Sequence, residues 1–475
     1  MASIKLKFKD FIGNKAFYKM AFAIIIPVVI QQIILSTAGY VDNLMISSYS
    51  DVAYLGVSTS NRFIFVMNFF WIGIASAISI FIAQYNGAKM KEKLRDLIQF
   101  ALVLAVIIGI ISMALIYFVG PWVLRQFISG NTEGELESVK AGTQYIQIIG
   151  LGAVIILINF VVSTMFRALG KPKIPMFAGI AGIVVNIGLN FVLIFGYLGF
   201  PAMGPTGAAI ATVISKVVEL GILVVISLFF TEDKYARKIW KRIYFDSQLV
   251  LMYFKKGVPI ILNEMMWAIG VQLMALFITW KNPVWLQSYN YFQNITDLFS
   301  VYYAGLATGT AVLVGSALGA NEFDRAKDIS RKLIGLMFMT TIAAIILVVS
   351  TSPLLLMLLT NDPMHYWNAY YLVLINSGLI VFYGFNSMVF YTLRAGGDSL
   401  KAFFLDQVPM YLLGIPITIL LALMEPKWQI GLLGIFALTK VVDIIKMFIA
   451  IHFYRTETWL VNLTITTTPK LEETA

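Results

Sequence analysis

Asp42 is a carboxylate at the end of a long uncharged stretch of the sequence. No charged residue lies between Lys19 and Asp42, and a helix of this length is sufficient to cross the hydrocarbon core of a bilayer. A carboxylate there is unfavourable unless it meets water or a polar partner, so Asp42 is a candidate functional residue that faces an internal cavity. Gln31 lies on the same helical face, because eleven residues at ~100° each return nearly to the start.

Glu264 is a second carboxylate within an apolar stretch, and its surroundings repeat those of the first stretch. Pro27 precedes Gln31-Gln32, and Pro259 precedes Asn263-Glu264 at the same spacing. A proline inside a helix removes a backbone donor and clashes with the preceding turn, so both prolines are predicted to kink their helices and act as hinges. Glu264 is either a protonated, hydrogen-bonded contact between helices or a titrating group that takes part in coupling or in substrate binding. Carboxylates inside membrane spans favour the second interpretation.

Amide side chains form two further polar patterns. Asn186 and Asn190 are four residues apart and share a helical face, where they either contribute to a site or form interhelical hydrogen bonds worth about 0.6 kcal/mol each. Asn290, Asn294 and Asp297 form a stripe on another predicted helix. Because lipid cannot satisfy these groups, the stripe should line a water-filled cavity or be buried against protein.

Several other polar residues are interpreted as structural. Each set of charges is close enough in sequence to be neutralised locally. The sets are Lys216 with Glu219, Lys440 with Asp443 and Lys446, and Asp406 with Arg394 and Lys401. Tyr289 and Tyr291 are assigned to an interfacial aromatic belt, in preference to a cation-binding role.

The composition indicates a membrane protein. Of the 475 residues, 59% are hydrophobic and only 13% are charged, whereas soluble globular proteins carry about 25% charged residues. There is no cysteine and there are only two histidines, which argues against disulfides, thiolate-bound metals and a histidine metal site. We find no Ser/His pairing and no filter-like loop, so an enzyme or a channel is disfavoured and no cofactor is expected. The net charge of +10 comes from residues that flank apolar spans, so we expect no nucleic-acid partner.

Apolar stretches predict twelve transmembrane helices. Their approximate bounds are 17–46, 53–85, 95–119, 138–167, 174–196, 206–230, 254–280, 285–317, 329–350, 365–393, 401–424 and 430–453. Lys and Arg concentrate at the termini and in the even-numbered connections, whereas the opposite side holds only Arg125, Lys140, Lys281 and Lys427. The positive-inside rule therefore predicts a multi-pass protein of the cell membrane with both termini in the cytoplasm.

The two halves of the sequence are related by a repeat. Pro27 and Pro259 are 232 residues apart, and Gly87-Ala88 and Gly319-Ala320 share this offset. The offset later becomes 227, where Arg167-Ala168-Leu169-Gly170 meets Arg394-Ala395-Gly396-Gly397. Six spans separate the copies, so both have the same orientation, related by an axis along the membrane normal.

These patterns predict an all-α polytopic fold with two parallel six-helix repeats. The predicted parts are a cytoplasmic interfacial segment (1–18), an N-lobe (19–230), a basic cytoplasmic linker (231–253), a C-lobe (254–455) and a cytoplasmic tail (456–475). Transport sites in folds of this kind lie near the midplane, between or within the repeats.

Several motifs resemble the multidrug and toxic compound extrusion (MATE) transporters over nearly the whole chain. The residues that carry the resemblance are Pro27 and Val41-Asp42, Phe166 to Pro172, Asn186 to Gly196, and Gly204 to Ala209. Gly257-Val258-Pro259 through Glu264 and Trp267, and Trp459-Leu460-Val461-Asn462-Leu463, look like the bacterial branch of that family. The resemblance implies twelve helices in two lobes that open as a V.

The resemblance also implies roles for individual residues. Asp42 matches the first-helix aspartate linked to cation coupling, and Asn186 matches a partner asparagine. Asn190 stands where proton-coupled members often have aspartate. Glu264 lies in the helix where sodium-coupled members carry a glutamate, but closer to Pro259 than in that pattern, and span 365–393 lacks their aspartate. Coupling to H+ and coupling to Na+ both stay open.

The leading hypothesis is a secondary antiporter that exports amphipathic organic cations in exchange for H+ or Na+, acting as a monomer in the lipid bilayer. The candidate site combines the acidic and amide residues named above, in a hydrated chamber with acidic walls. An alternative is a flippase of related fold for lipid-linked saccharides. A pyrophosphate headgroup would require Arg or Lys inside, and Arg62 and Lys216 are the clear basic residues within spans, so this alternative is disfavoured.

Overall fold

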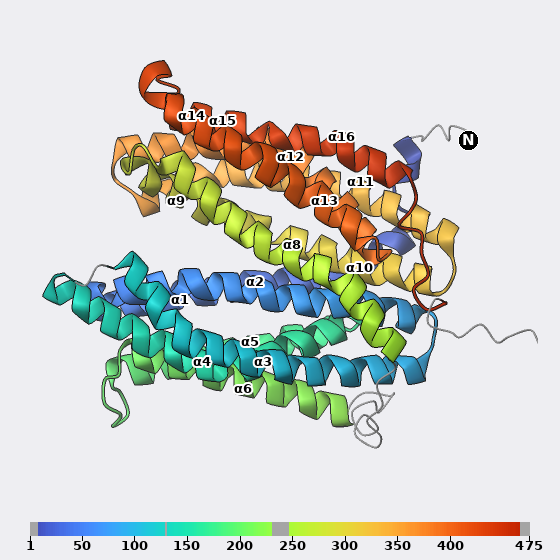
Figure 1. The fold of residues 1–475 in the computed structure, drawn as a ribbon, viewed down its shortest axis with the longest axis horizontal. Helices are drawn as coiled ribbons and strands as arrows, with labels where there is room; N and C mark the ends of the chain where they lie inside the picture. Colours follow the sequence, from blue (N-terminus) through green and yellow to red (C-terminus); the bar gives the residue numbers. More distant parts are fainter. Residues whose placement is uncertain (1–7, 129–130, 230–246, 466–475) are drawn as a thin grey trace, which may run out of the picture. The chain divides into compact units, whose positions relative to one another are not determined.

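The computed structural model describes residues 8–128, 131–229 and 247–465, and every regular element within them is helical (Figure 1). The chain divides into two compact units. Unit 1 comprises Met1–Val29, Ala83–Lys89 and Lys255–Ala475, and unit 2 comprises Ile30–Ile82 and Met90–Phe254. Three helices, α1 (Lys15–Tyr49), α2 (Asp51–Gly87) and α8 (Ser247–Thr279), contribute to both units.

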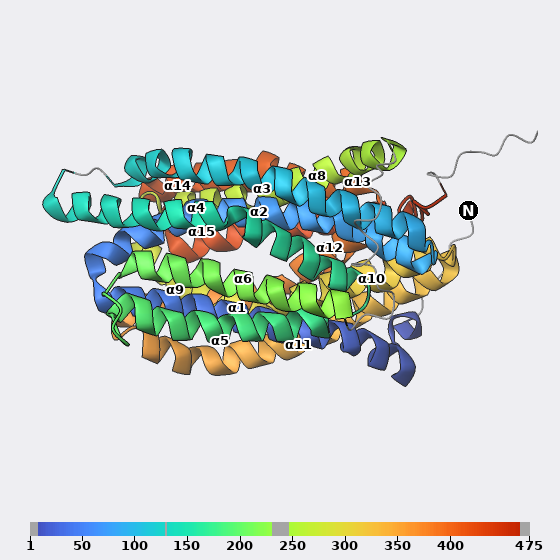
Figure 2. The same cartoon turned by 90° about the horizontal axis from the view of Figure 1, so that it is seen from below.

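Unit 2 is built mainly from four further helices packed in pairs. They are α3 (Lys91–Phe127), α4 (Glu133–Ala168), α5 (Lys173–Phe195) and α6 (Pro205–Phe229). Helix α3 packs along α4, and α6 packs against both α4 and α5 (Figure 2). The start of α8 (Ser247–Thr279) also belongs to this unit, where Tyr253 is fully buried against Phe81 and Phe100.

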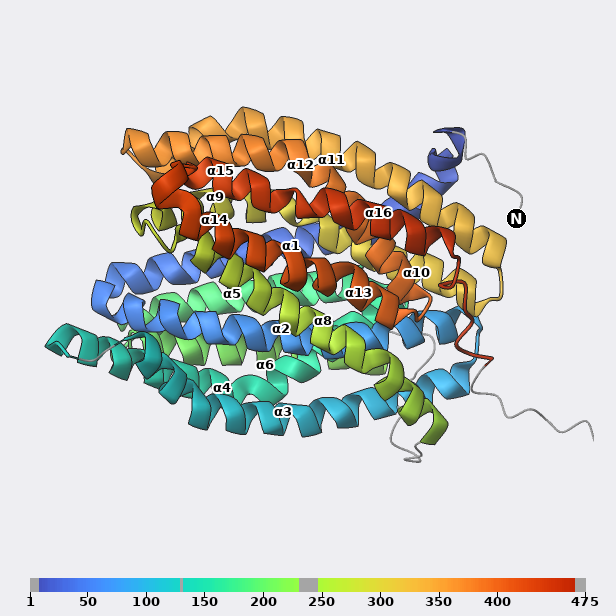
Figure 3. The same cartoon turned by 45° about the horizontal axis from the view of Figure 1, so that its top comes forward.

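Unit 1 contains the remaining helices. After most of α8 come α9 (Val284–Ser300), α10 (Tyr302–Gly319), α11 (Phe323–Leu359), α12 (Pro363–Ala395), α13 (Ser399–Pro409), the π-helical turn η2 (Met410–Gly414), α14 (Ile415–Trp428), α15 (Gly431–Lys440) and α16 (Val442–Arg455). Helix α12 packs against α11, α13 and α16 and so forms the centre of the unit (Figure 3). The short helix η1 (Phe8–Phe11) contacts α11.

The described helices agree with the predicted spans but are less continuous. Eleven helical segments are long and apolar enough to cross a membrane, counting α9 with α10 and α13 with the start of α14. The twelfth predicted span, 430–453, is divided at Val441 into α15 and α16, each too short to cross alone. Such breaks are tolerated at membrane depth where neighbouring helices cover the freed backbone.

The predicted linker and terminal segments are partly helical or packed. Residues 231–246 of the predicted linker lie outside the described residues, and the linker's end, from Ser247, forms the first turns of α8. The interfacial segment contains η1 and the start of α1, while its residues 1–7 are outside the description. The described part of the predicted tail, residues 456–465, packs within unit 1.

The C-terminal strap, defined as Trp459–Thr464, binds the end of α2. The side chain of Gln84 is fully buried; its amide donates to the carbonyls of Ala395 at 2.8 Å and Val461 at 3.3 Å, and its oxygen accepts from the Leu463 amide at 2.8 Å. Gly396 is required here, because a Cβ atom would collide with the carbonyl of Trp459. The strap therefore joins the ends of α2 and α12.

Replacing Gln84 with leucine should destabilise unit 1, because three hydrogen bonds are lost and two buried carbonyls lose their donor. We expect the free energy of unfolding to fall by about 2–4 kcal/mol. The measurement is the midpoint of thermal unfolding of the purified protein in detergent, which should be lower. Gln126→Leu, at an exposed position in α3, is the matched control and should leave the midpoint unchanged. Equal midpoints for the two variants would contradict the structural role of Gln84.

Candidate functional site

Asp42 forms a cluster with three polar side chains inside unit 2. Asn190 donates a hydrogen bond to the carboxylate of Asp42 and a weaker one, at 3.4 Å, to Asn186. Asn186 reaches the hydroxyl of Thr212 at 3.5 Å. Asn186 and Asn190 are buried, whereas Asp42 is only half-buried. The structure thus brings together Asp42 and the two asparagines that the sequence singled out.

Tight packing of α5 against α6 positions this cluster. Helix α5 ends at Gly196 in the left-handed conformation, and Pro205 begins α6 after a short turn. A Cβ atom at Gly207 would collide with the backbone of Leu193, so only glycine permits this close approach. The close approach brings Thr212 of α6 level with the asparagines of α5.

The Asp42 cluster has the chemistry of a site for a small cation. Among the described residues, no basic side chain lies within ion-pair distance of the Asp42 carboxylate. The amide oxygen of Asn190 is buried without a hydrogen-bond donor. Carboxylate, amide and hydroxyl oxygens are the ligands that hard cations prefer.

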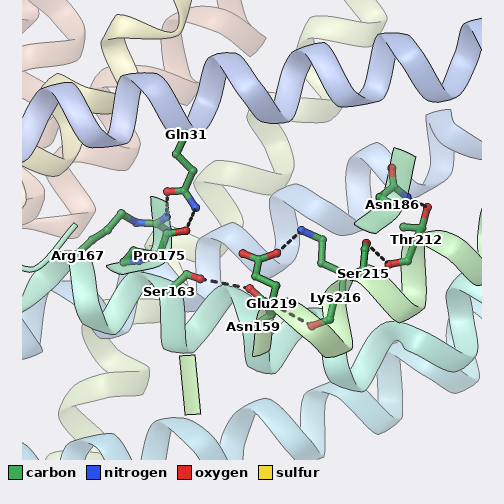
Figure 4. A network of polar contacts seen from close by, with 10 residues as sticks. All are labelled: Gln31, Asn159, Ser163, Arg167, Pro175, Asn186, Thr212, Ser215, Lys216 and Glu219. Atoms are coloured by element: carbon green, nitrogen blue, oxygen red, sulfur yellow. Dashed lines mark hydrogen bonds and ion pairs between the residues drawn. The ribbon is translucent and has the colours of Figure 1, made fainter. Parts of the chain in front are cut away.

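Gln31 belongs to the polar network of unit 2 drawn in Figure 4, which also contains Asn186 and Thr212 of the Asp42 cluster. Its amide donates to the carbonyl of Pro175 at 3.1 Å, and its oxygen accepts from Arg167 at 3.2 Å. Lys216 and Glu219 of α6 lie in the same network and form the predicted ion pair at 2.8 Å. Gln32, the neighbouring candidate, is half-buried and is not part of this network.

Glu264 is paired with an arginine inside unit 1. Its carboxylate lies 2.6 Å from the guanidinium of Arg394, and the two side chains are only 16% and 9% exposed. The partner comes from the last turn of α12, 130 residues away in sequence. The predicted pairing of Arg394 with Asp406 is therefore wrong, because Arg394 neutralises the deeper carboxylate of α8 instead.

Asp406 pairs with Lys446 of α16 at 3.0 Å. It also accepts hydrogen bonds from Asn263 at 3.2 Å and from Gln407 at 3.0 Å. The prediction that Lys446 is neutralised within its own helix by Asp443 is wrong. The ion-pair partner is therefore set by packing between helices, and not by the three-residue spacing along α16.

The polar stripe of α9 lies on the exposed face of that helix. Asn290, Asn294 and Asp297 are exposed, while the opposite face packs into the apolar core of unit 1. Because lipid cannot satisfy these groups, this face requires water or polar contacts. Tyr289 is 6% exposed and packs against Phe436, so its predicted place in an interfacial belt is wrong.

The sequence did not identify the two arginines as partners of site residues. Arg167 contacts Gln31, and Arg394 contacts Glu264, in different units. The signal was present, because the two arginines are related by the repeat offset of 227. Their partners occupy neighbouring positions of the repeat in α1 and α8, since Gln31 matches Asn263, the residue before Glu264. If equivalent residues of the two halves are assumed to make equivalent contacts, Arg167 and Arg394 are both assigned partners in α1 and α8.

Both candidate hinge prolines lie close to the boundaries of the compact units. In α1 the boundary falls between Val29 and Ile30, just after Pro27. In α8 it falls between Phe254 and Lys255, just before Pro259. Among the described residues, no group of three or more His, Cys, Asp or Glu side chains gathers as a divalent metal site would require.

Known proteins share this sequence and fold. YisQ of Bacillus subtilis, called an uncharacterized transporter, is 24% identical over 92% of this chain and 94% of its own. A probable multidrug resistance protein NorM of Thermotoga maritima is 26% identical over 86% of each chain. A structure titled as the outward-facing conformation of a multidrug resistance MATE family transporter has a TM-score of 0.82 at 20% identity, over 95% of this chain and 97% of its own, which supports the fold.

The sequence model of the MatE family matches the chain in two ranges, residues 27–192 and 259–420. The ranges begin at Pro27 and Pro259, as the predicted repeat requires, and together they cover more than half of the chain. The resemblance noted from the sequence is confirmed, and the chain belongs to the MatE family of multi-pass membrane transporters.

Proposed function

We propose that this transporter is a secondary antiporter that exports amphipathic organic cations in exchange for H+ or Na+. The observation that carries the proposal is the cluster of Asp42 with Asn186 and Asn190. A half-buried carboxylate without a basic partner, surrounded by oxygen-bearing side chains, can release one cation and take another. Two relatives are named as probable multidrug resistance proteins, which agrees with an organic substrate.

The proposed cycle alternates the occupancy of Asp42. With a proton or Na+ bound, the charge of the carboxylate is neutralised. Without it, the carboxylate attracts a cationic substrate. The ion drives transport only through a difference in its affinity for the two access states of the protein. Pro27 and Pro259 act as hinges, a role supported by the unit boundaries next to each proline.

Glu264 is proposed as a second carboxylate of the cycle. In the described state Arg394 neutralises it at 2.6 Å, so a substrate cation has to displace the guanidinium. The exposed amides and Asp297 of α9 supply further polar contacts for the substrate or its water.

The proposed setting is the cell membrane, with a monomeric protein and both termini in the cytoplasm. The distribution of Lys and Arg supports this orientation. The saccharide flippase is less well supported, because Lys216 is engaged by Glu219 and so does not offer a free cation to a pyrophosphate.

Asp42→Asn should abolish ion-driven efflux, because the amide neither titrates nor binds Na+ with a full charge. The measurement is efflux of a cationic dye from everted vesicles, with pH and Na+ gradients imposed separately to identify the ion. Asp51→Asn, at the exposed start of α2, is the control and should transport as the wild type does. Wild-type rates from Asp42→Asn would remove Asp42 from the mechanism, and headgroup flipping without dye efflux would favour the flippase.

Arg394→Met should destabilise the protein strongly, because it leaves the charge of Glu264 buried without a partner. We expect the free energy of unfolding to fall by about 3–5 kcal/mol. The measurement is the midpoint of thermal unfolding in detergent, which should be lower. The double variant Glu264→Gln/Arg394→Met removes both charges and should recover most of the loss. If the loss of stability in the double variant equals the sum of the losses in the two single variants, the two residues are not coupled.

A further inference from the structure

The turn between α4 and α5 of unit 2 recurs in unit 1 as the turn between α12 and α13. In unit 2 the amides of Gly170 and Lys171 donate to carbonyls in the last turn of α4. In unit 1 the amides of Gly397 and Asp398 make the same two bonds to α12. Both glycines have a left-handed φ, of 75° and 74°. The two pairs of residues differ by the repeat offset of 227, so the same backbone turn is built twice.

In unit 1 this turn is covered by the C-terminal part of the chain. A Cβ atom at Gly397 would lie 2.9 Å from the side chain of Leu463, which belongs to the strap. Asp398 accepts a hydrogen bond from the hydroxyl of Thr458 at 2.6 Å and lies 3.6 Å from the ammonium of Lys401. The acidic residue of this turn is therefore both covered and paired by protein.

The arginine that precedes the turn has a carboxylate partner in unit 1 but not in unit 2. Arg394 pairs with Glu264, and the residue equivalent to Glu264 in α1 is Gln32. Arg167 donates to two neutral side-chain oxygens, at 3.2 Å and 2.7 Å, one of which belongs to Gln31 (Figure 4). In the part of the chain that the structure describes, no carboxylate lies within ion-pair distance of Arg167. The positive charge of the repeat is thus kept in unit 2, whereas its counter-ion is not.

Two lysines add to the positive charge of the turn in unit 2. Lys171 occupies the position of Asp398, and Lys173 occupies the position of Leu400. Lys171 is half-buried and Lys173 is exposed. Neither lysine forms an ion pair within residues 8–128, 131–229 and 247–465. The turn is therefore basic in unit 2, where its counterpart in unit 1 has a carboxylate and an apolar residue.

The described neighbours in unit 2 leave this charge uncompensated. Glu219 of α6 lies within electrostatic range of Arg167, but its carboxylate is already paired with Lys216 at 2.8 Å. A Cβ atom at Gly170 would meet nothing within 4 Å, whereas the equivalent glycine of unit 1 meets the strap. The turn is therefore open as well as basic, and it lies at the end of two membrane-spanning helices.

An anionic phospholipid is the partner whose chemistry fits this turn. The positive-inside rule predicts that the turn faces the cytoplasm, and the cytoplasmic leaflet carries anionic lipids that attract basic residues beside membrane spans. A guanidinium and an ammonium both bind phosphate oxygens well. Residues 231–246 of the predicted linker match less well, because they include five Lys or Arg and only three Asp or Glu.

We propose that the turn between α4 and α5 binds the phosphate headgroup of an anionic phospholipid through Arg167, Lys171 and Lys173. The bound lipid covers in unit 2 the turn that the strap covers in unit 1, and its phosphate supplies the counter-ion that Gln32 does not. The proposal depends on the location of the protein in a membrane and is independent of the proposed antiport.

The test gives the turn of unit 2 the residues that its counterpart carries in unit 1. In the variant Lys171→Asp/Lys173→Leu the backbone turn should be kept, because Asp398 and Leu400 occupy the same turn. Purified protein in detergent is titrated with phosphatidylglycerol and, separately, with phosphatidylcholine, and bound lipids are counted by native mass spectrometry. We expect the variant to lose one tightly bound phosphatidylglycerol, with an affinity about 30-fold lower. Binding of phosphatidylcholine should not change.

The matched control is Arg125→Asp/Lys140→Leu, which makes the same change of charge at exposed positions near the opposite ends of α3 and α4. It should bind phosphatidylglycerol as the wild type does. An equal loss in the control would show attraction by net charge alone and would overturn the proposal. Unchanged binding in Lys171→Asp/Lys173→Leu would also overturn it, as would a wild-type protein without a tightly bound phosphatidylglycerol.

Two further measurements keep the result interpretable. The midpoint of thermal unfolding in detergent checks that the variants are folded, and Lys173→Leu alone, at an exposed position, should still weaken binding about fivefold. Inorganic phosphate is then added as a competitor. If it displaces phosphatidylglycerol from the wild type at a similar concentration, the turn binds a free anion and the assignment to a lipid is wrong.

Discussion

The structure depends on one constraint: a charge placed at membrane depth needs a partner inside the same helical unit or access to water. Lys216 with Glu219, Arg394 with Glu264, and Lys446 with Asp406 each satisfy this requirement. Buried ion pairs of this kind are seldom more stable than apolar residues of the same size. Among the described residues, Asp42 lies outside such pairs, and for this reason the proposed function rests on it first.

The two halves of the repeat share a helix contact but carry different polar residues around it. Asparagines at equivalent positions, Asn159 and Asn386, make the same contact to the last long helix of each half. Around this shared contact the residues differ in charge: unit 2 has Lys216 and Glu219, whereas unit 1 has Asp443 and Lys446 at the equivalent positions. The repeat therefore keeps a backbone contact while the charges around it change.

Much of the fold was predictable from the sequence, because it depends on features that are periodic or local. Hydropathy sets the spans, and Pro27 and Pro259 mark the repeat that the family model also matches. The joining of Asp42 with Asn186 and Asn190 followed from the resemblance. The partners of Arg394 and Lys446 were mispredicted, because spacing along one helix favours neighbours in sequence, whereas packing brought Glu264 and Asp406 closer.

The strap has a consequence for biosynthesis. Gln84 and its partner Leu463 are 379 residues apart, and a ribosome that adds about 5–20 residues per second needs roughly 20–75 s to make that interval. During this time the amide of Gln84 lacks its native contacts, and its transfer into lipid is unfavourable. It therefore has to remain hydrated, which holds the end of α2 at the aqueous boundary while the later helices enter the bilayer. Gln84, which holds the strap in the mature protein, therefore first keeps the end of the nascent α2 in water.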